Sequence, residues 1–284
     1  MSRRRRLEHH RRGLADIRDI MNSMKNLAYI EARKLNRFLA AQHAVVQSIE
    51  EVAADFVSFY PETLPEAERA TEVYLLLGSE RGFCGNFNHA ILKHMELLLS
   101  DKPRGSPVIT VGQKLSVLLR GDERVVASLE GPSVVEEMPA VLKTVVRELT
   151  ALQQQHTMLT VIAVYHGVEG KVTARQILPP FRHLLHRPRE FANPPMLNQH
   201  PREFLLELTD HYLFAALYEI LYASFMAENH HRLGHLERAV RHLDDQSTDL
   251  KRRCNALRQE EIIEEIEVIL LSAANLGEGW KKHG

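Results

Sequence analysis

Cysteine is scarce in this chain of 284 residues, which contains only Cys84 and Cys254. Two cysteines cannot build a disulfide framework, and such sparse use is typical of a reducing compartment. Aromatic residues make up 6% of the chain, and the formal net charge is −1. This balance of charge gives no bulk electrostatic reason to expect nucleic acid as a partner.

Proline and glycine are missing from two long stretches. All 12 prolines lie within residues 61–201, whereas residues 14–60 contain neither proline nor glycine. Residues 202–276 contain no proline and one glycine, Gly234. Because proline and glycine interrupt helices, the pattern divides the chain into four segments. They are a basic tail (1–13), an N-terminal coiled-coil helix (14–60), an α/β domain with a proline-rich exit loop (61–201), and a C-terminal coiled-coil helix with its tail (202–284).

Membrane-spanning and secretory segments are also not expected. The most apolar run, residues 212–227, is interrupted by Glu219 and is shorter than the roughly 18–20 residues that cross a bilayer. Residues 1–13 carry six arginines against one glutamate, and no apolar stretch follows them, so they do not resemble a secretory signal. We interpret this segment as a solvated tail, because no aromatic residues are interleaved with the arginines as in a nucleic-acid-binding arm.

An apolar stripe with steps of three and four residues runs through residues 14–59. Twelve of its fourteen positions are apolar, a pattern that indicates a coiled-coil helix over more than six heptads. Such a helix is much longer than the average of about 11–12 residues in globular domains and needs a partner helix. The seam residues predicted on this helix are Leu14, Ile17, Met21, Met24, Leu35, Phe38 and Val45.

A second stripe follows the C-terminal segment, where leucines are spaced by seven before the stripe shifts to isoleucines. The seam residues predicted there are Leu236, Leu243, Leu250, Leu257, Ile262 and Ile266. Because a folded domain separates the two helices in the chain, we expect them to pair as a long antiparallel coiled coil. The second helix is the longer one, so part of it is expected to project alone, and an exposed apolar projection favours insertion into another protein.

Strands and helices alternate in the middle of the chain. The expected strands are residues 72–77, 107–111, 125–129 and 159–165, with an edge strand at 171–178, and the expected helices are 87–99, 113–119 and 135–155. This alternation predicts an α/β domain with a largely parallel, Rossmann-like sheet. The fold class is therefore mixed α+β/α/β, a long antiparallel coiled coil plus a central α/β domain.

The sequence lacks the common motifs of catalysis and nucleotide binding. It has no Walker motif, no GxGxxG, no HExxH, no CxxC and no Gly-x-Ser-x-Gly elbow. Residues 81–85 lie between a strand and a helix, where an anion would find backbone N–H groups, but a tight turn explains the glycines equally well. We predict a structural turn formed by Arg81, Gly82, Cys84 and Gly85.

Two further residue groups leave alternatives open. Cys84 is either a reactive thiol at a helix N-terminus or, as we favour, a small buried residue. His231 and His235 lie one helical turn apart, but a zinc site needs a second pair of ligands that the sequence does not offer. We therefore predict no metal, no cofactor and no active site on this chain.

Three stretches and the overall layout together resemble one family, the gamma subunit of F-type rotary ATP synthases. Residues 79–88 are similar to the family's Ser-Asp-Arg-Gly-Leu-Cys-Gly-x-Leu-Asn turn, and residues 255–262 to its Asn-x-x-Arg-Gln-x-x-Ile stretch. Residues 227–233 are similar to the family's Ser-Glu-x-x-Ala-Arg-Met run. The chain departs from the terminal signature at Ile263, Val268 and Ser272, where the family usually has threonine, an acid and glycine.

This resemblance implies a non-catalytic central rotor shaft that couples the flow of protons or sodium ions to ATP synthesis or hydrolysis on the beta subunits. The implied partners are the alpha and beta subunits of the catalytic ring, the epsilon subunit and the c-subunit rotor ring, with one copy of this chain per complex. The implied location is peripheral, at the cytoplasmic face of the bacterial inner membrane. The residues implied to contact a beta-subunit loop are Arg258 and Gln259, with Arg252 and Arg253 adding positive charge beside them. A stand-alone α/β enzyme with a coiled-coil arm and a nucleic-acid-binding protein are the alternatives.

Overall fold

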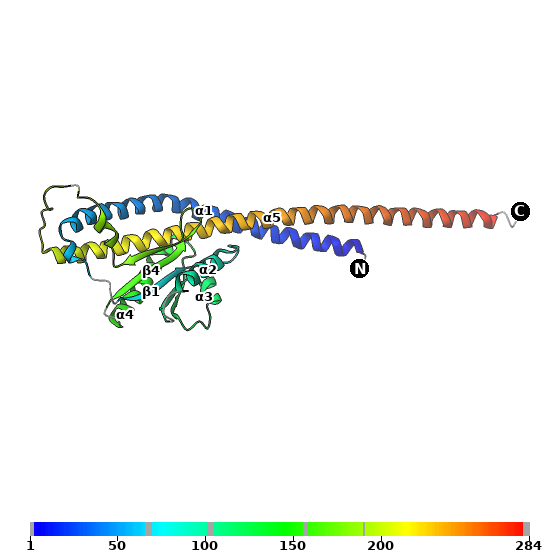
Figure 1. Ribbon diagram of the computed structural model, residues 1–284. Coiled ribbons are helices and arrows are strands. Elements are labelled where there is room, and N and C mark those ends of the chain that lie inside the picture. The colour runs from blue at the N-terminus through cyan, green and yellow to red at the C-terminus, as the bar shows by residue number, and fades with distance from the viewer. Residues whose placement is uncertain (1–2, 66–69, 101–104, 156–157, 190, 281–284) are drawn as a thin grey trace. The chain divides into compact units, whose positions relative to one another are not determined.

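A computed structural model of the chain describes residues 3–65, 70–100, 105–155, 158–189 and 191–280, the last ten by their backbone alone. The chain forms two compact units. The helical unit comprises Met1–Asn26 and Leu236–Gly284, and the sheet unit comprises Leu27–His235. Two helices, α1 (Arg3–Phe59) and α5 (Pro201–Trp280), contribute residues to both units (Figure 1).

Helix α1 begins at Arg3, well before the start expected after Gly13. A glycine inside a helix costs only about 1 kcal/mol relative to alanine, and arginine is a good helix former. The carboxylate of Glu8 also accepts a hydrogen bond from Arg4 one turn earlier, at 3.0 Å. The basic segment, from Arg3 onward, is therefore the first part of the helix and not a tail outside it.

The sheet has five strands in the order β3-β2-β1-β4-β5. The strands are β1 (Thr71–Leu77), β2 (Val108–Val111), β3 (Val125–Leu129), β4 (Leu159–His166) and β5 (Val172–Leu178). The first four are parallel, and β5 pairs antiparallel with β4 at the edge. The α-helices that follow strands in the sheet unit are α2 (Phe87–Leu99), α3 (Gln113–Leu118) and α4 (Met138–Gln155). This arrangement confirms the predicted largely parallel sheet and its edge strand.

Three short 3-10 helices complete the described elements. They are η1 (Pro61–Thr63), η2 (Val135–Glu137) and η3 (Arg182–His186). The first turn of the helix expected at 135–155 is η2, and α4 continues from it. The proline-rich segment between β5 and α5 contains η3 and is otherwise without regular structure in its described part.

Alternate residues of β1 face two different cores. Val73, Leu75 and Leu77 belong to the core that includes residues of α1, α4 and α5. Tyr74 and Leu76 belong to the core that includes residues of α2 and α3. Burial on both faces explains why this strand is an almost continuous apolar run, as is typical of the centre of a parallel sheet.

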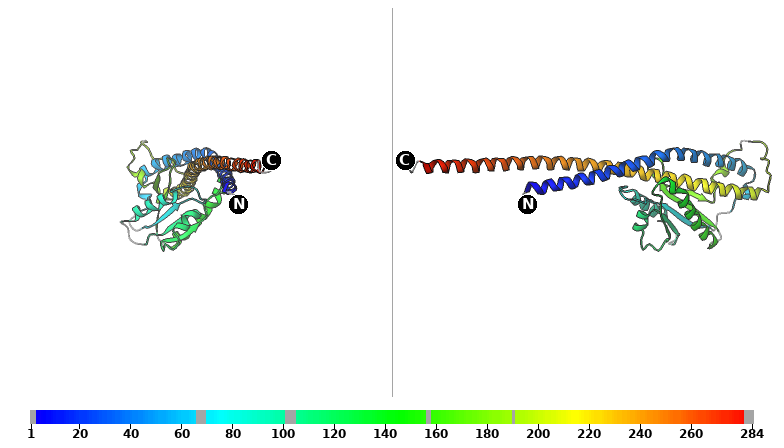
Figure 2. Two further views of the ribbon diagram at one scale, coloured as in Figure 1. Left: turned by 90° about the vertical axis from the view of Figure 1, so that its right-hand side faces the viewer. Right: turned by 180° about the vertical axis from the view of Figure 1, so that it is seen from behind.

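Helices α1 and α5 pack antiparallel within the sheet unit (Figure 2). The rings of Phe38 and Tyr222 stack with centroids 5.9 Å apart, and those of Phe56 and Phe204 lie 4.9 Å apart. Residue numbers thus rise along α1 while they fall along α5. The pairing confirms the predicted packing of the N-terminal helix against the C-terminal one.

The same two helices pack antiparallel in the helical unit. Arg4 lies 2.7 Å from Glu261, and Arg18 lies 2.5 Å from Asp244. Both ion pairs are at least one-third exposed, so each contributes little stability and mainly records the register. Within the described residues, none of the helices combines the length and the apolar character that crossing a bilayer requires.

Candidate functional site: the long helices and the turn after strand β1

The buried face of α1 is wider than the predicted seam and is displaced from it. Leu14 and Leu35 are buried as expected, and Met21 and Met24 are half-buried. Three other predicted seam residues are about half exposed: Ile17 (45%), Phe38 (50%) and Val45 (48%). In the sheet unit Leu39 and Val46 are buried in place of Phe38 and Val45, and Ala32 and Ala53 are buried on the same stripe.

The buried residues of α1 keep the heptad spacing in another register. Ala28, Ala32, Leu35, Leu39, Val46, Ala53 and Phe56 are separated by steps of three, four and seven residues, so alternate positions fall one residue later than predicted. In the sheet unit α1 also packs against the sheet core. Phe38 still contacts α5 through its stacked ring, but it does so from the margin of the interface.

The predicted seam on α5 follows its burial more closely. Leu236 is fully buried, and Leu243, Leu250 and Leu257 are half-buried. Cys254, which lies between the last two leucines, is also buried. The two remaining predicted seam residues, Ile262 and Ile266, are 45% and 51% exposed.

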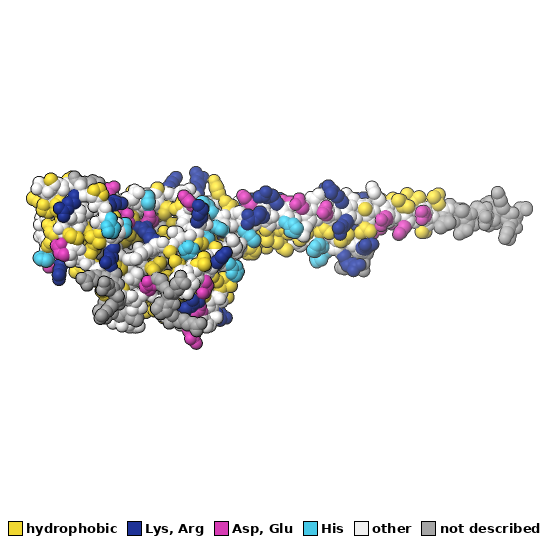
Figure 3. Space-filling model, in the orientation of Figure 1, with side chains coloured by type: hydrophobic (Ala, Val, Ile, Leu, Met, Phe, Trp, Pro, Cys, Tyr) yellow, Lys and Arg dark blue, Asp and Glu magenta, His cyan; other side chains and the backbone are white. Residues whose placement is uncertain are grey.

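The C-terminal part of α5 carries a group of exposed apolar side chains, which we call the terminal stripe. Its members are Ile262, Ile263, Ile266, Val268, Ile269 and Leu270, each between 45% and 66% exposed. Figure 3 shows hydrophobic side chains gathered along this part of the helix. Arg4, near the first residue of α1, pairs with Glu261 of α5. The described part of α1 therefore extends along α5 only as far as Glu261, and the terminal stripe follows that residue. Ser272 has no described side chain.

The four residues implied to contact a beta subunit lie just before the terminal stripe. Arg252, Arg253, Arg258 and Gln259 are all exposed. Arg252 lies 3.5 Å from Asp249 in a pair that is mostly exposed on both sides. Arg252 and Gln259 are seven residues apart and therefore share one face of α5.

The turn between β1 and α2 is shaped by its backbone. Phe83 and Gly85 both adopt left-handed conformations, with φ of 64° and 62°. Cys84 between them is buried, and burial raises the pKa of its thiol to about 11. A buried thiol that keeps its proton is a poor nucleophile, so the arrangement favours the structural role expected for Cys84. Arg81 and Gly85 are exposed and Gly82 is half-buried.

Two glycines allow this turn to pack against the next loop of the sheet. A Cβ on Gly78 would lie 2.2 Å from the Cβ of Leu115. A Cβ on Gly112, whose φ is 106°, would lie 2.6 Å from the Gly78 carbonyl oxygen. The carboxylate of Glu80 then accepts hydrogen bonds from the backbone N–H groups of Gln113 (2.9 Å) and Gly131 (2.7 Å). The turn is thereby tied to the segments that follow strands β2 and β3.

A buried carboxylate on α5 binds the same turn. Glu228 is 2% exposed and pairs with Arg232, which is 6% exposed. It also accepts hydrogen bonds from the backbone N–H groups of Glu80 and Arg81, each at 3.4 Å. Arg232 donates to the carbonyl oxygen of Gly82 at 3.2 Å. Burial raises the pKa of Glu228, and the charge of Arg232 opposes that shift.

A second polar cluster joins α5 to α1 and to the edge strand β5. Arg175 lies 2.6 Å from Glu219 of α5 and 3.2 Å from Glu50 of α1. It also donates to the hydroxyl of Tyr212 at 3.1 Å, and burial raises the pKa of that hydroxyl. His43 of α1 lies 2.5 Å from the other oxygen of Glu219. One guanidinium group therefore links three elements of the sheet unit.

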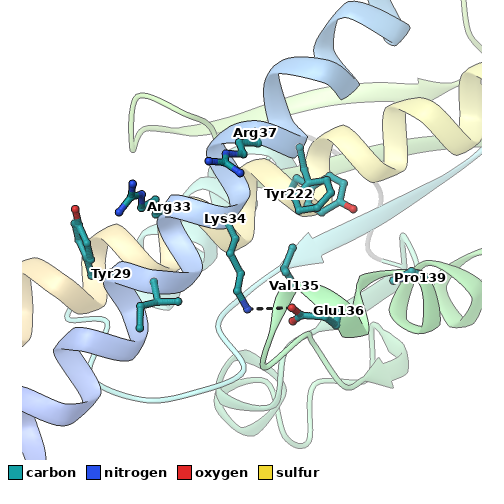
Figure 4. A pocket seen from close by; sticks show the side chains of 10 residues that line it. Tyr29, Arg33, Lys34, Arg37, Val135, Glu136, Pro139 and Tyr222 are labelled. Carbon is teal, nitrogen blue, oxygen red and sulfur yellow. Dashed lines mark hydrogen bonds and ion pairs between the residues drawn. The ribbon is translucent and has the colours of Figure 1, made fainter.

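A groove of about 690 Å³ lies between α1 and the segment around η2 (Figure 4). Lys34 crosses this groove to Glu136 at 2.9 Å, and the side chains of Arg33, Arg37 and Tyr222 also line it. The sequence offered no signal for the groove, because its residues come from three separate segments.

No metal centre is formed by the described residues. None of their histidines, cysteines and carboxylates gather in groups of three or more that would hold a metal ion. The ring of His231 packs edge-on against Phe87 at 5.4 Å and lies 5.1 Å from the ring of His166. His231 therefore takes part in packing between α5 and the start of α2.

Sequence comparison gives one consistent result. The family model described as ATP synthase matches residues 4–276. Two relatives named ATP synthase gamma chain, from the Langeland and Okra strains of Clostridium botulinum, are each 24% identical over 268 residues. Each alignment covers 91% of this chain and 93% of the relative.

Solved structures show the same fold at lower identity. The central stalk and c-ring structure of Tetrahymena thermophila mitochondrial ATP synthase contains a chain with 17% identity and a TM-score of 0.59. That match covers 78% of this chain and 99% of the other. The Euglena gracilis mitochondrial ATP synthase structure of OSCP, F1 and c-ring contains one with 14% identity and a TM-score of 0.67, covering 99% and 96%.

Proposed function

Since the chain belongs to the ATP synthase gamma chain family, and is thus the non-catalytic central-stalk subunit of an F-type ATP synthase, we propose that it turns inside a ring of alpha and beta subunits. The terminal stripe supports this proposal, because exposed apolar surface of this kind marks a site where another protein binds. Epsilon and the c-subunit rotor ring are the further proposed partners. The proposed location is peripheral, at the cytoplasmic face of the bacterial inner membrane, with one copy per complex.

The proposed mechanism is differential contact between an asymmetric shaft and three equivalent catalytic subunits. A contact shifts the conformation of a beta subunit only by the difference in free energy that it makes between the two states. Moving a site from almost entirely closed to almost entirely open needs about 5.5 kcal/mol. Hydrogen bonds to charged groups contribute about 1.5–3 kcal/mol each, so a few such contacts together with steric exclusion are enough.

Arg258 and Gln259 are the proposed donors to the beta-subunit loop, with Arg252 and Arg253 supporting them. This assignment is supported by their exposure to solvent. All four side chains are exposed in the helical unit, and they immediately precede the terminal stripe. We expect Arg258→Ala with Gln259→Ala to lower the coupled turnover of the assembled complex while assembly itself is retained. The matched control is Arg147→Ala with Glu148→Ala, on the exposed face of α4. Unchanged turnover in the first variant would remove these two residues from the mechanism.

Purification with native partners tests the proposal itself. We expect a hexameric ATPase ring to copurify with the tagged chain, and we expect Ile262→Gln with Ile266→Gln to weaken that association. The control is Leu97→Gln, which changes another exposed apolar side chain, 66% exposed, outside the terminal stripe. Recovery of the chain without an ATPase ring would contradict the proposed function.

A further inference from the structure

Helix α5 is held by two separate groups of polar side chains within the sheet unit, the first buried and the second partly exposed. We call the first the Glu228 joint, which consists of Glu228 and Arg232 with the backbone of residues 80–82. We call the second the Glu219 joint, which consists of Glu219, Arg175, Glu50, Tyr212 and His43. Neither group takes part in the proposed contacts with the beta subunits.

The two joints contact opposite faces of α5. Glu219 and Glu228 are nine residues apart, which corresponds to about 2.5 helical turns and about 13.5 Å along the axis. Half a turn beyond two full turns places the two side chains on opposite sides of α5. The Glu219 joint reaches the edge strand β5 and helix α1, whereas the Glu228 joint reaches the turn after β1.

Apolar packing alone would not hold α5 in one rotational position. The surface between the joints is largely apolar, with Ala216, Ile220, Ala223 and Met226 all buried. Burial of such surface is non-directional, so it opposes separation of the helix from the sheet much more than it opposes rolling of the helix. Hydrogen bonds and ion pairs depend on direction, and buried ones are best known for fixing register.

We propose that the two joints lock the rotational position of α5 against the sheet, and that torque passes between the helix and the α/β domain through them. Glu228 and Arg232 are then positioning residues for the rotary mechanism, and Glu219 and Arg175 have the same role on the opposite face. This inference rests on the proposed function of the chain as a shaft. It identifies the two joints as the contacts that make the shaft resist twisting.

The test measures angular fluctuation in the assembled complex. The ring is fixed to a surface, and a gold rod is attached to the α/β domain through Glu123→Cys, an exposed position; the two natural cysteines are buried. The joint variant is Glu228→Gln with Arg232→Met, and its matched control is Glu148→Gln with Arg147→Met, the same changes in a pair whose side chains are 29% and 71% exposed. With the ring stalled, we expect the angular variance to rise at least twofold in the joint variant and to stay unchanged in the control.

A stability control separates the joint from general weakening. We expect Val145→Ala, a fully buried position on α4, which contributes to neither joint, to lower the stability of the same unit and to leave the angular variance unchanged. Equal variance in the joint variant and the natural chain would overturn the inference, and so would equal widening by Val145→Ala. If the double variant does not assemble, Glu228→Asp, which keeps the charge and withdraws the carboxylate by one methylene, is measured in the same way. A failure of the proposed function would show itself differently, because even the natural chain labelled at residue 123 would then not join or rotate within a ring.

Discussion

Two adjacent valines on α1 provide a direct test of how this helix packs. Val46 is 2% exposed, whereas Val45, the seam residue expected from the heptad pattern, is 48% exposed. Replacing Val46 by alanine removes two buried carbons, which costs about 1.6 kcal/mol in transfer free energy and leaves a cavity that adds to this cost. Alanine has the higher helix propensity, by up to about 0.7 kcal/mol, and this partly offsets the loss. We therefore expect Val46→Ala to lower the free energy of unfolding by about 1.5–2 kcal/mol.

The same substitution at Val45 should have little effect. About half of its side chain is already in contact with water, so the transfer cost falls to about 0.8 kcal/mol, and the gain in helix propensity offsets most of that. Urea unfolding of the two variants, compared at unchanged m value, measures the difference. Equal destabilisation, or a larger effect at Val45, would refute the packing of α1 described here.

Three other predictions concern backbone, ionisation and helix continuity. Gly78→Ala should lower the melting temperature, because its Cβ has no room, while Gly82→Ala, with open space around it, should change it little. The folded chain holds the Cys84 proton up to a pKa of about 11, against an ordinary value near 9.0; raising the pH through this window should therefore destabilise the natural chain more than Cys84→Ala, as followed by urea unfolding. Proline at Met24 or Leu250 should cost about 3 kcal/mol or more locally and abolish ATP-driven ion pumping by the complex, and normal pumping would argue against torque passing through the helices.

Much of the fold could be predicted because its signals are local. The positions of proline and glycine mark where the two long helices give way to the domain between them, and apolar runs bounded by turns mark the strands. The antiparallel pairing follows from the domain that lies between the helices in the chain. The start of α1 was predicted wrongly because Gly13 was read as a boundary, whereas a single glycine costs a long helix little.

The buried face of α1 and the two joints could not be predicted in the same way. The apolar residues of α1 fit two heptad registers that differ at alternate positions, such as Val45 and Val46, and only the tertiary fold selects one of them. The Glu219 joint combines residues from α1, β5 and α5, and only the tertiary fold brings these together. Glu219 was noticeable in the sequence as the one charge within the apolar run 212–227, and its partner Arg175 gave no signal of its own.

Rotation of this chain as a shaft within an ATPase ring can be observed directly. The most direct measurement places a gold rod on Glu123→Cys in the purified complex, fixes the ring to a surface and supplies ATP. We expect the rod to rotate in one direction, in steps of one third of a turn, at a rate that follows ATP hydrolysis. A rod that stays still or only fluctuates while the ring hydrolyses ATP would contradict it.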